Sequence, residues 1–440
     1  MPQAFSVDDL YLHKRITELH TVRGKEVAAC TVRSVDREND KYTSCIWAFP
    51  LDGSPPRQLT QGPGTDNMPR WSPDGQRLAF TSDRGGSVQL YVLDEAGGEA
   101  RQVGQLDGAP ASPRWSPDGR HLYFGKPCHV DPDWRGQRGQ NPKPRGPKAP
   151  EVAWKLPYKS DGLGYMLARE IHLFCMDAAS GQAKQLTDGP FDVLAFDPSP
   201  NGKHIAFVRT REGRFSHATD LWVCDAGGGN ARQLTREFSM VMQPLWSPDG
   251  RWILFSGSED EGDALSYLWL LEFATGEVTQ LGDDSALLSA PDTAHWAADS
   301  QSLIFGRVHR GRHEIAKISV PGGEITVLNR ADRQLGALGL TGTHFAFTGD
   351  TPVAPSELHC CKADGSGERR VSNLNPWWDD RPRLEMKARE FQVPDGKGGT
   401  ETIQGWLLHE EGAQGPMPLL NGAGRSGTPT SSRRRSSWHR

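Results

Sequence analysis

Side chains that could bind a metal or a phosphate occur in this sequence, but their spacing does not assemble a site. His309 and His313 have the i, i+4 separation of a metal-binding pair on a helix, yet the intervening Arg310-Gly311-Arg312 indicates a turn between strands. Gly227-Gly228-Gly229 lacks the strand-to-helix transition and the Lys-Ser/Thr of a phosphate cradle, and it indicates a hairpin turn. The 14 histidines and 55 acidic residues are spread along the chain. We predict no catalytic, cofactor-binding or metal-ligating residue, and no cofactor.

The cysteines also give no indication of a disulfide framework or a metal site. The seven cysteines are Cys30, Cys45, Cys128, Cys175, Cys224, Cys360 and Cys361. Their number is odd and their spacing is not that of paired metal ligands, and a chain of this size does not need disulfides to fold. Cys360 and Cys361 are adjacent on an expected strand, so their side chains point to opposite faces. We predict reduced, mostly buried thiols.

The elements that would position a site belong to an internal repeat. Its signature is Trp-Ser-Pro-Asp-Gly followed by a short apolar strand. Complete copies begin at Trp71, Trp115 and Trp246, and weaker copies begin at Phe196 and Trp296. In the signature, Pro presets its own φ, Asp tolerates the next turn position and Gly accepts a positive φ, which predicts a tight turn. The Trp before the turn is expected to fill an apolar site and not to stack on a ligand.

Each repeat continues with a third and a fourth strand in the same order. Leu90-Tyr91-Val92-Leu93-Asp94 is typical of the third and Arg57-Gln58-Leu59-Thr60 of the fourth. The outer units, Val27 to Thr60 and Leu338 to Ser372, lack the Trp but keep the strands. Four strands recurring about every 40–50 residues are typical of a β-propeller, whereas a β-sandwich would not repeat such a unit. We predict an all-β fold with a seven-bladed β-propeller over residues 23–375.

The third repeat unit is longer than the other units. Phe124 and Phe207 are 83 positions apart, whereas the neighbouring intervals are 44 and 48 positions, which indicates an insertion at about 125–168. Between Lys126 and Ser160 this segment has eight Lys/Arg, three Asp/Glu and seven Pro. Such a composition is typical of an exposed, partly extended excursion. Two interpretations stay open: a solvated surface loop, or a basic lip that contacts substrate carboxylates or a partner domain.

The two ends of the chain differ from the repeats. In residues 1–22, Ser6-Val7-Asp8-Asp9 can cap a short helix with Leu10, Ile16 and Leu19 on one side. Across 376–420, alternating apolar residues at 391–393 and 403–408 predict strands that begin a second domain. Residues 421–440 contain five Arg and five Ser without apolar periodicity, so we expect a disordered tail, which we interpret as an aberrant, frameshifted terminus.

Overall composition is that of an ordinary globular protein. The net charge is −5 and 24% of residues are charged, which indicates no general affinity for nucleic acid. The first 20 residues contain no uninterrupted apolar stretch, and no run of about 18 apolar residues occurs anywhere. We therefore expect a cytoplasmic protein without a membrane partner.

The sequence resembles the prolyl oligopeptidase family of serine peptidases, in particular its acylaminoacyl-peptidase-like branch. The resemblance covers about residues 1–420. It rests on the Trp-Ser-Pro-Asp-Gly repeats, on Leu156 to Tyr165 leading into His172-Leu173-Phe174, and on Gln404-Gly405-Trp406-Leu407-Leu408. The last segment resembles the start of that family's α/β-hydrolase domain. The repeats alone are shared with non-catalytic propellers of the TolB type.

The resemblance implies a propeller that covers an active site and admits only short peptides. It also implies a C-terminal hydrolase domain with a Ser nucleophile on a Gly-x-Ser-x-Gly elbow and a His-Gly-Gly oxyanion loop. This sequence has no Gly-x-Ser-x-Gly, and after Leu420 it has Asn421-Gly422-Ala423-Gly424. No catalytic position can therefore be transferred, and we expect no peptidase activity from this chain alone.

Two functions remain open. The first is the propeller portion of a truncated acylaminoacyl-peptidase-like enzyme. Its expected partners are short peptides in the axial channel and the missing hydrolase domain. This interpretation is also compatible with a homo-oligomer. The second is a stand-alone TolB-like propeller that binds a protein or peptide without catalysis. The first predicts an exposed apolar face around the N-terminal helix and residues 375–420, whereas the second predicts polar ends and a monomer.

Overall fold

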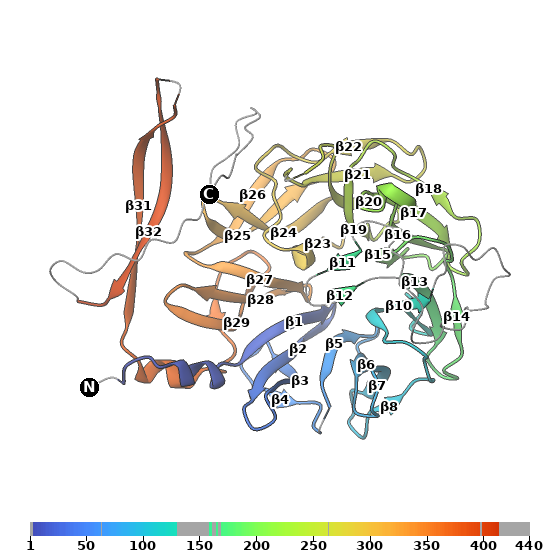
Figure 1. Cartoon of the computed structure of the whole chain (residues 1–440), viewed down its shortest axis with the longest axis horizontal. Coiled ribbons are helices and arrows are strands. Elements are labelled where there is room, and N and C mark those ends of the chain that lie inside the picture. The colour runs from blue at the N-terminus through green and yellow to red at the C-terminus, as the bar shows by residue number, and fades with distance from the viewer. Residues whose placement is uncertain are drawn as a thin grey trace.

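The structure is a computed structural model of the chain, and it describes residues 3–62, 64–129, 158–160, 164–165, 169–262, 264–396 and 398–412. Within these residues, seven four-stranded antiparallel sheets are arranged as blades around a central axis (Figure 1). The predicted all-β, seven-bladed propeller is confirmed. Each blade is assembled from strands that are consecutive within the described residues, except for a separate pair inside blade 3.

The first four blades follow the order of the chain. Blade 1 has β1 (Arg15–Val22), β2 (Lys25–Asp36), β3 (Lys41–Pro50) and β4 (Arg57–Gln58). Blade 2 has β5 (Asp66–Trp71), β6 (Arg77–Ser82), β7 (Gln89–Asp94) and β8 (Arg101–Gln102). Blade 3 has β9 (Ala111–Trp115), β10 (His121–His129), β13 (Arg169–Asp177) and β14 (Ala183–Gln185). Blade 4 has β15 (Val193–Pro198), β16 (His204–Thr210), β17 (Thr219–Asp225) and β18 (Arg232–Gln233).

The remaining blades keep the same pattern. Blade 5 has β19 (Met240–Trp246), β20 (Trp252–Ser258), β21 (Tyr267–Glu272) and β22 (Val278–Gln280). Blade 6 has β23 (Ala294–Trp296), β24 (Ser302–His309), β25 (Arg312–Ser319) and β26 (Ile325–Arg330). Blade 7 has β27 (Gln334–Leu340), β28 (His344–Thr351), β29 (Ala354–Lys362) and β30 (Arg369–Arg370). Two short 3-10 helices lie in the connections, η2 (Gly213–Phe215) and η3 (Pro291–Thr293).

The repeat signature forms the predicted tight turn between the first two strands. In blade 2, Gly75 N donates to Ser72 O at 2.8 Å, and Ser72 N donates to Arg77 O at 2.7 Å. Gly75 has φ +67°, which is the left-handed conformation that favours glycine. Asp74 accepts a hydrogen bond from Gln76 N at 3.1 Å, so the Asp of the signature also stabilises the turn.

The hydrophobic core lies between the blades. The described residues contain seven buried apolar clusters, and each joins two adjacent blades. The signature tryptophans belong to these clusters and are at most 7% exposed, so their predicted structural role is confirmed. Trp115 Nε1 donates to Arg70 O at 2.9 Å and Trp296 Nε1 to Leu245 O at 3.1 Å, which ties a blade to the preceding one.

The propeller has two distinct faces. Because every first strand runs in the same direction, the Ser-Pro-Asp-Gly turns lie together on one face, here called the turn face. The chain enters β1 and leaves β30 on the opposite face, here called the termini face. Contacts between the ends agree with this: Gln3 N donates to Asp380 O at 3.0 Å, and the rings of Phe5 and Trp378 are 5.0 Å apart.

The N-terminal helix is shorter than predicted, and the propeller begins earlier. A 3-10 helix, η1 (Val7–Tyr11), is followed by β1, so the boundary expected at residue 22 lies near Arg15. Ile16 and Leu19 contact the same apolar cluster but are strand residues. A register shift between Ile16 and Glu18 inserts an extra residue, which places residues three apart on one face and imitates a helical spacing.

Beyond blade 7, a 3-10 helix, η4 (Pro376–Asp380), leads into a hairpin of β31 (Leu384–Pro394) and β32 (Thr400–Glu410). The two strands predicted at 391–393 and 403–408 are therefore confirmed as strands. In Figure 1 the hairpin stands outside the ring of blades. The expected disordered tail at 421–440 lies outside the described residues.

The excursion of blade 3 joins its second and third strands. β10 continues to His129 and β13 begins at Arg169, because residues 121–129 pair in unbroken register with residues 169–177. The predicted start at residue 125 is therefore too early. A two-stranded sheet of β11 (Lys159–Ser160) and β12 (Gly164–Tyr165) belongs to this excursion and projects near the middle of the ring in Figure 1. The rest of the expected basic lip, 130–157, 161–163 and 166–168, lies outside the described residues.

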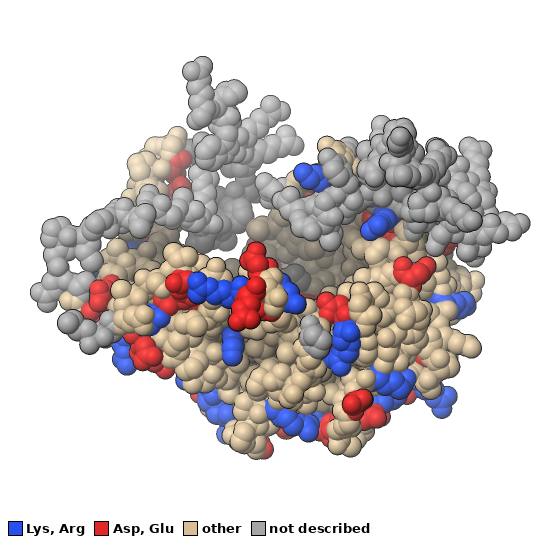
Figure 2. All heavy atoms as spheres, turned by 60° about the horizontal axis from the view of Figure 1, so that its bottom comes forward, with Lys and Arg blue, Asp and Glu red and all other residues tan. Residues whose placement is uncertain are grey.

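The surface agrees with the balanced composition. On the face shown in Figure 2, Lys and Arg side chains alternate with Asp and Glu, and no large area has a single sign of charge. Within the described ranges, no helix is long and apolar enough to cross a membrane.

Candidate functional site in the axial channel

The innermost strands place one residue per blade at the same register position. Arg70 of β5 pairs with Ala79, which pairs with Val92, and the corresponding pairs identify the equivalent residue in the other blades. This residue directly precedes the signature Trp where a Trp is present. In order of blades, the residues are His20, Arg70, Arg114, Asp197, Leu245, His295 and Gly339. We call this set the channel ring.

The charges of the polar ring members influence one another, so these side chains belong to one electrostatic cluster. Burial lowers the pKa of His20 well below its usual value, and the charges of Arg70 and Arg114 and the nearby His295 lower it further. These residues belong to blades 1, 2, 3 and 6, which are not all neighbours. Burial also lowers the pKa of His295, whose Nε2 is 2.7 Å from Leu338 O. Both histidines are therefore neutral at pH 7.

Asp197 is the acidic member of the ring. Its Oδ1 is 3.7 Å from Nη1 of Arg114, and its Oδ2 accepts a hydrogen bond from Trp246 N at 2.8 Å. Burial raises the pKa of Asp197 to about 6, although Arg114 and the Trp246 hydrogen bond both favour the ionised form. At pH 7 the carboxylate is therefore mostly ionised, and it forms an ion pair with Arg114.

Arg70 has no such partner. Its Nη1 donates to Pro69 O at 2.8 Å, and within the described residues no carboxylate lies at ion-pair distance from it. Burial, and next the charge of Arg114, lower the pKa of Arg70 to about 10, although the charges of Asp292 and Glu18 act in the opposite direction. The guanidinium is still charged at pH 7, so the ring contains a partly buried cation beside a second cation.

Bulges interrupt three of the inner strands close to the ring. Met68, Ser112 and Gln243 have positive φ values of 56°, 51° and 52°, and each precedes a Pro near a register shift of its strand. β-bulges commonly re-aim side chains next to functional sites. Glu18 accepts hydrogen bonds from Met68 N and from Thr31 Oγ1, both at 2.6 Å, so its carboxylate is already engaged by the protein.

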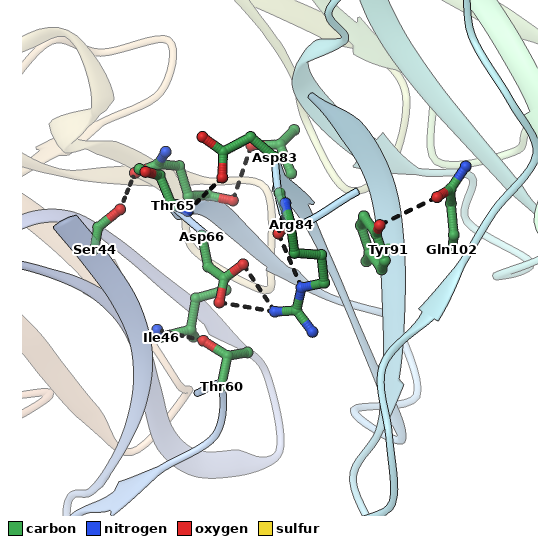
Figure 3. Close-up of polar contacts among 12 residues, drawn as sticks. Ser44, Ile46, Thr60, Thr65, Asp66, Asp83, Arg84, Tyr91 and Gln102 are labelled. Atoms are coloured by element: carbon green, nitrogen blue, oxygen red, sulfur yellow. Dashed lines mark hydrogen bonds and ion pairs between the residues drawn. The ribbon is translucent and has the colours of Figure 1, made fainter. Parts of the chain in front are cut away.

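A second polar cluster, shown in Figure 3, has a structural role. Arg84 Nη2 is 2.8 Å from both carboxylate oxygens of buried Asp66, and its guanidinium lies over Phe80 and Tyr91. Thr65 N donates to Asp83 Oδ1 at 2.6 Å. The cluster fixes the loop between β6 and β7, and its charges are satisfied within the chain.

The residues weighed from sequence lie where the spacing indicated. His309 and His313 flank the turn between β24 and β25, and His313 Nδ1 accepts from Leu335 N at 2.8 Å. In the part of the chain that the structure describes, no three His, Cys, Asp or Glu residues gather as metal ligands. Gly227-Gly228-Gly229 forms the turn before β18, where Asp225 N donates to Gly229 O at 2.9 Å.

The cysteine predictions are confirmed. All seven are free, and five of them are buried. Cys360 and Cys361 belong to different apolar clusters, because they point to opposite faces of β29. Burial raises the pKa of Cys361 to about 12, so this thiol is not a nucleophile at pH 7.

The channel ring was missed from sequence, although a signal exists. Aligning the repeats on Trp71, Trp115, Trp246 and Trp296 places Arg, Arg, Leu and His in the column immediately before the Trp. Because side chains alternate along a strand, the residue before the Trp lies on the opposite side of the sheet, which faces the following blade. Only the closed ring shows that these side chains meet.

The comparisons with known proteins agree with the propeller fold. The profile of the TolB beta propeller domain matches residues 32–129 and 163–378. The uncharacterized peptidase YuxL of Bacillus subtilis is 27% identical over 447 residues, which covers 96% of this chain and 66% of that protein. Dipeptidyl-peptidase 5 of Porphyromonas gingivalis is 25% identical over 331 residues, 71% of this chain and 47% of that protein.

A solved structure of an acylaminoacyl peptidase in complex with Z-Gly-Gly-Phe-chloromethyl ketone has a similar fold. The TM-score is 0.70 at 17% identity, and the match covers 94% of this chain and 61% of that one. The present chain thus spans between about half and two thirds of the length of these proteins.

Proposed function

The chain belongs to the TolB beta propeller domain family, and we propose that it is the propeller portion of a serine peptidase resembling acylaminoacyl peptidase. In this proposal the axial channel admits short or N-acylated peptides to a hydrolase domain on the termini face. The chain described here supplies no nucleophile, because it lacks a Gly-x-Ser-x-Gly elbow.

The observation that carries the proposal is the extent of the similarity. The match to the Bacillus peptidase covers 96% of the chain and so continues beyond blade 7 into the β31–β32 hairpin. A propeller related to other families only through its repeats would not be expected to match there. The similarity therefore favours the peptidase over a stand-alone propeller.

Exposed apolar side chains give independent support. Of the 14 large apolar residues that are exposed among those described, ten lie in 5–12 and 391–408. Both segments leave the propeller on the termini face. Apolar side chains concentrated in this way are typical of a surface that another domain covers.

We also keep a cytoplasmic location as part of the proposal. Seven free thiols and no disulfide in a chain of this length support a reducing compartment, because disulfides persist mainly in oxidising ones.

The experiment begins with the DNA downstream of the codon for Leu420. We expect a sequence encoding a Gly-x-Ser-x-Gly elbow, in this or another reading frame. The protein made from that joined frame should hydrolyse N-acetylated short peptides and react with a fluorophosphonate probe, whereas the purified 440-residue chain should do neither. Inhibitor-sensitive hydrolysis by the purified chain itself, or the absence of any hydrolase-coding sequence downstream, would contradict the proposal.

A further inference from the structure

We propose that the channel ring binds the carboxylate of a peptide between Arg70 and Arg114. The identification of the ligand as a peptide rests on the proposed function, whereas the binding of a carboxylate does not. Two neighbouring cations attract an anion, and a carboxylate fits the planar fork of a guanidinium.

The first argument is the unequal pairing of charges in the ring. Arg70 makes its hydrogen bond to the neighbouring backbone at Pro69 and has no carboxylate at ion-pair distance within the described residues. Arg114 shares Asp197 at 3.7 Å, which is longer than a direct charge-assisted hydrogen bond. Within the described residues, the two cations on adjacent blades therefore have one acid at ion-pair distance, Asp197.

The other acids near the ring, Glu18 and Asp292, attract Arg70, but among the described residues neither lies at ion-pair distance from it. Glu18 accepts hydrogen bonds from Thr31 Oγ1 and Met68 N. Asp292 is exposed, and it accepts a hydrogen bond from Gln243 Nε2 at 3.3 Å. An incoming carboxylate would thus meet donors that the protein has not already used, and it would relieve the repulsion between the two guanidinium groups.

The position of the ring fixes the direction of the bound peptide. The ring residues lie at the end of the inner strands next to the turn face, whereas the chain ends lie on the termini face. From Leu245 to the start of β19 at Met240 the inner strand spans five residues, or at most about 17 Å at about 3.4 Å per residue, because the bulge at Gln243 shortens it. A peptide held by its C-terminal carboxylate would present its N-terminal end to the termini face after about five extended residues.

The test is calorimetric titration of the full 440-residue chain with an N-acetylated hexapeptide, as the free acid and as the C-terminal amide. We expect the acid to bind about tenfold more tightly, because hydrogen bonds to charged groups contribute about that much. Arg70→Gln and Arg114→Gln should each reduce this preference. Arg120→Gln is the matched control, since Arg120 is on the turn face, is exposed and forms only a 4.0 Å ion pair with Asp118.

Circular dichroism and melting temperature establish that each variant is folded, and either arginine variant suffices if the other does not fold. Equal binding of acid and amide by the unaltered chain would overturn the proposal, as would a preference that survives both arginine substitutions. A third peptide, amidated and ending in Glu, separates the two sources of carboxylate: binding as tight as that of the acid would overturn the assignment to the C-terminus. None of these binding results depends on a hydrolase domain. If the DNA downstream of codon 420 encoded no hydrolase, only the proposed function would be contradicted.

Discussion

At the scale of single residues, His172 shows how burial is converted into pH sensitivity. The side chain is fully buried in blade 3, with Nδ1 3.3 Å from Thr187 Oγ1 and its ring edge-on to Phe191. Burial lowers its pKa to about 4, against 6.5 for an ordinary histidine. The unfolded chain therefore binds a proton in a range where the folded chain does not.

This difference predicts the sign of a stability change. The contribution of neutral His172 is fully present above pH 6.5 and is lost as the pH falls from 6.5 toward 4, by up to about 3 kcal/mol. His172→Asn should lose this part of the acid sensitivity in chemical denaturation measured between pH 7 and pH 4.5. His217→Asn, at a half-exposed site, is the control. Identical pH profiles for His172→Asn and the unaltered chain would contradict the prediction.

Residue type determines how much of a site can be predicted from sequence. Trp71 could be assigned to the core because a large apolar side chain beside a Pro-Asp-Gly turn has few stable positions. Arg70, one position earlier, could not be assigned, because an arginine is equally compatible with solvent, an ion pair or a channel. Its role depends on Arg114 and Asp197, which are 44 and 127 positions away.

At the scale of elements, the strands follow from local patterns, whereas their ends depend on neighbours. The Ser-Pro-Asp-Gly turns predicted the hairpins correctly, since Pro and Gly restrict the backbone directly. β1 was missed because its bulge after Ile16 gives apolar residues a spacing of three. The predicted end of β10 came too early, because Lys126 and Pro127 suggest a loop. In the structure the pairing of β10 with β13 continues to His129.

The contact between the hairpin and blade 6 yields a prediction for Gly311. Gly311 has φ +70°, and a Cβ there would overlap Cη2 of Trp406 and lie 2.7 Å from Cζ2. Gly311→Ala should therefore displace β32, and hydrogen exchange of residues 384–410 should become several-fold faster. Gly262→Ala provides the comparison, because Gly262 has φ +89° and nothing lies within 4 Å of the added Cβ.

Both substitutions carry the same kind of backbone cost, about 1–2 kcal/mol for a left-handed alanine. Only the first has the steric overlap with Trp406. Equal exchange in the hairpin of the two variants would show that Trp406 does not hold β32 against the propeller.

At the scale of the whole molecule, the ring of blades is closed without exchange of a strand. Blade 1 is formed by β1 to β4 and blade 7 by β27 to β30. One apolar cluster, side-chain hydrogen bonds and a backbone hydrogen bond from Gly24 N to Thr341 O at 2.9 Å join them. Glu26 is central to this seam: its carboxylate accepts from Thr343 Oγ1 at 2.6 Å and from Thr341 Oγ1 at 2.9 Å. The repeats predicted seven blades, but they contain no information on which contacts close the ring.

Removing the carboxylate should weaken this seam selectively. We expect Glu26→Ala to lower the unfolding free energy by about 1 kcal/mol and to accelerate hydrogen exchange in β1 and β27 more than in blade 4. Glu324→Ala, at an exposed position outside the seam, should change neither. Uniform acceleration across all blades would indicate global destabilisation and contradict a local role.

The central claim is that short peptides enter the axial channel. The most direct measurement is photo-crosslinking of an N-acetylated hexapeptide acid carrying a benzophenone to the purified chain, with the modified residues identified by mass spectrometry. We predict crosslinks on the inner strands β5, β9 and β19, competed by unlabelled peptide acid and reduced in Arg70→Gln. Crosslinks confined to the outer strands or to the β31–β32 hairpin, or none at saturating peptide, would contradict the claim.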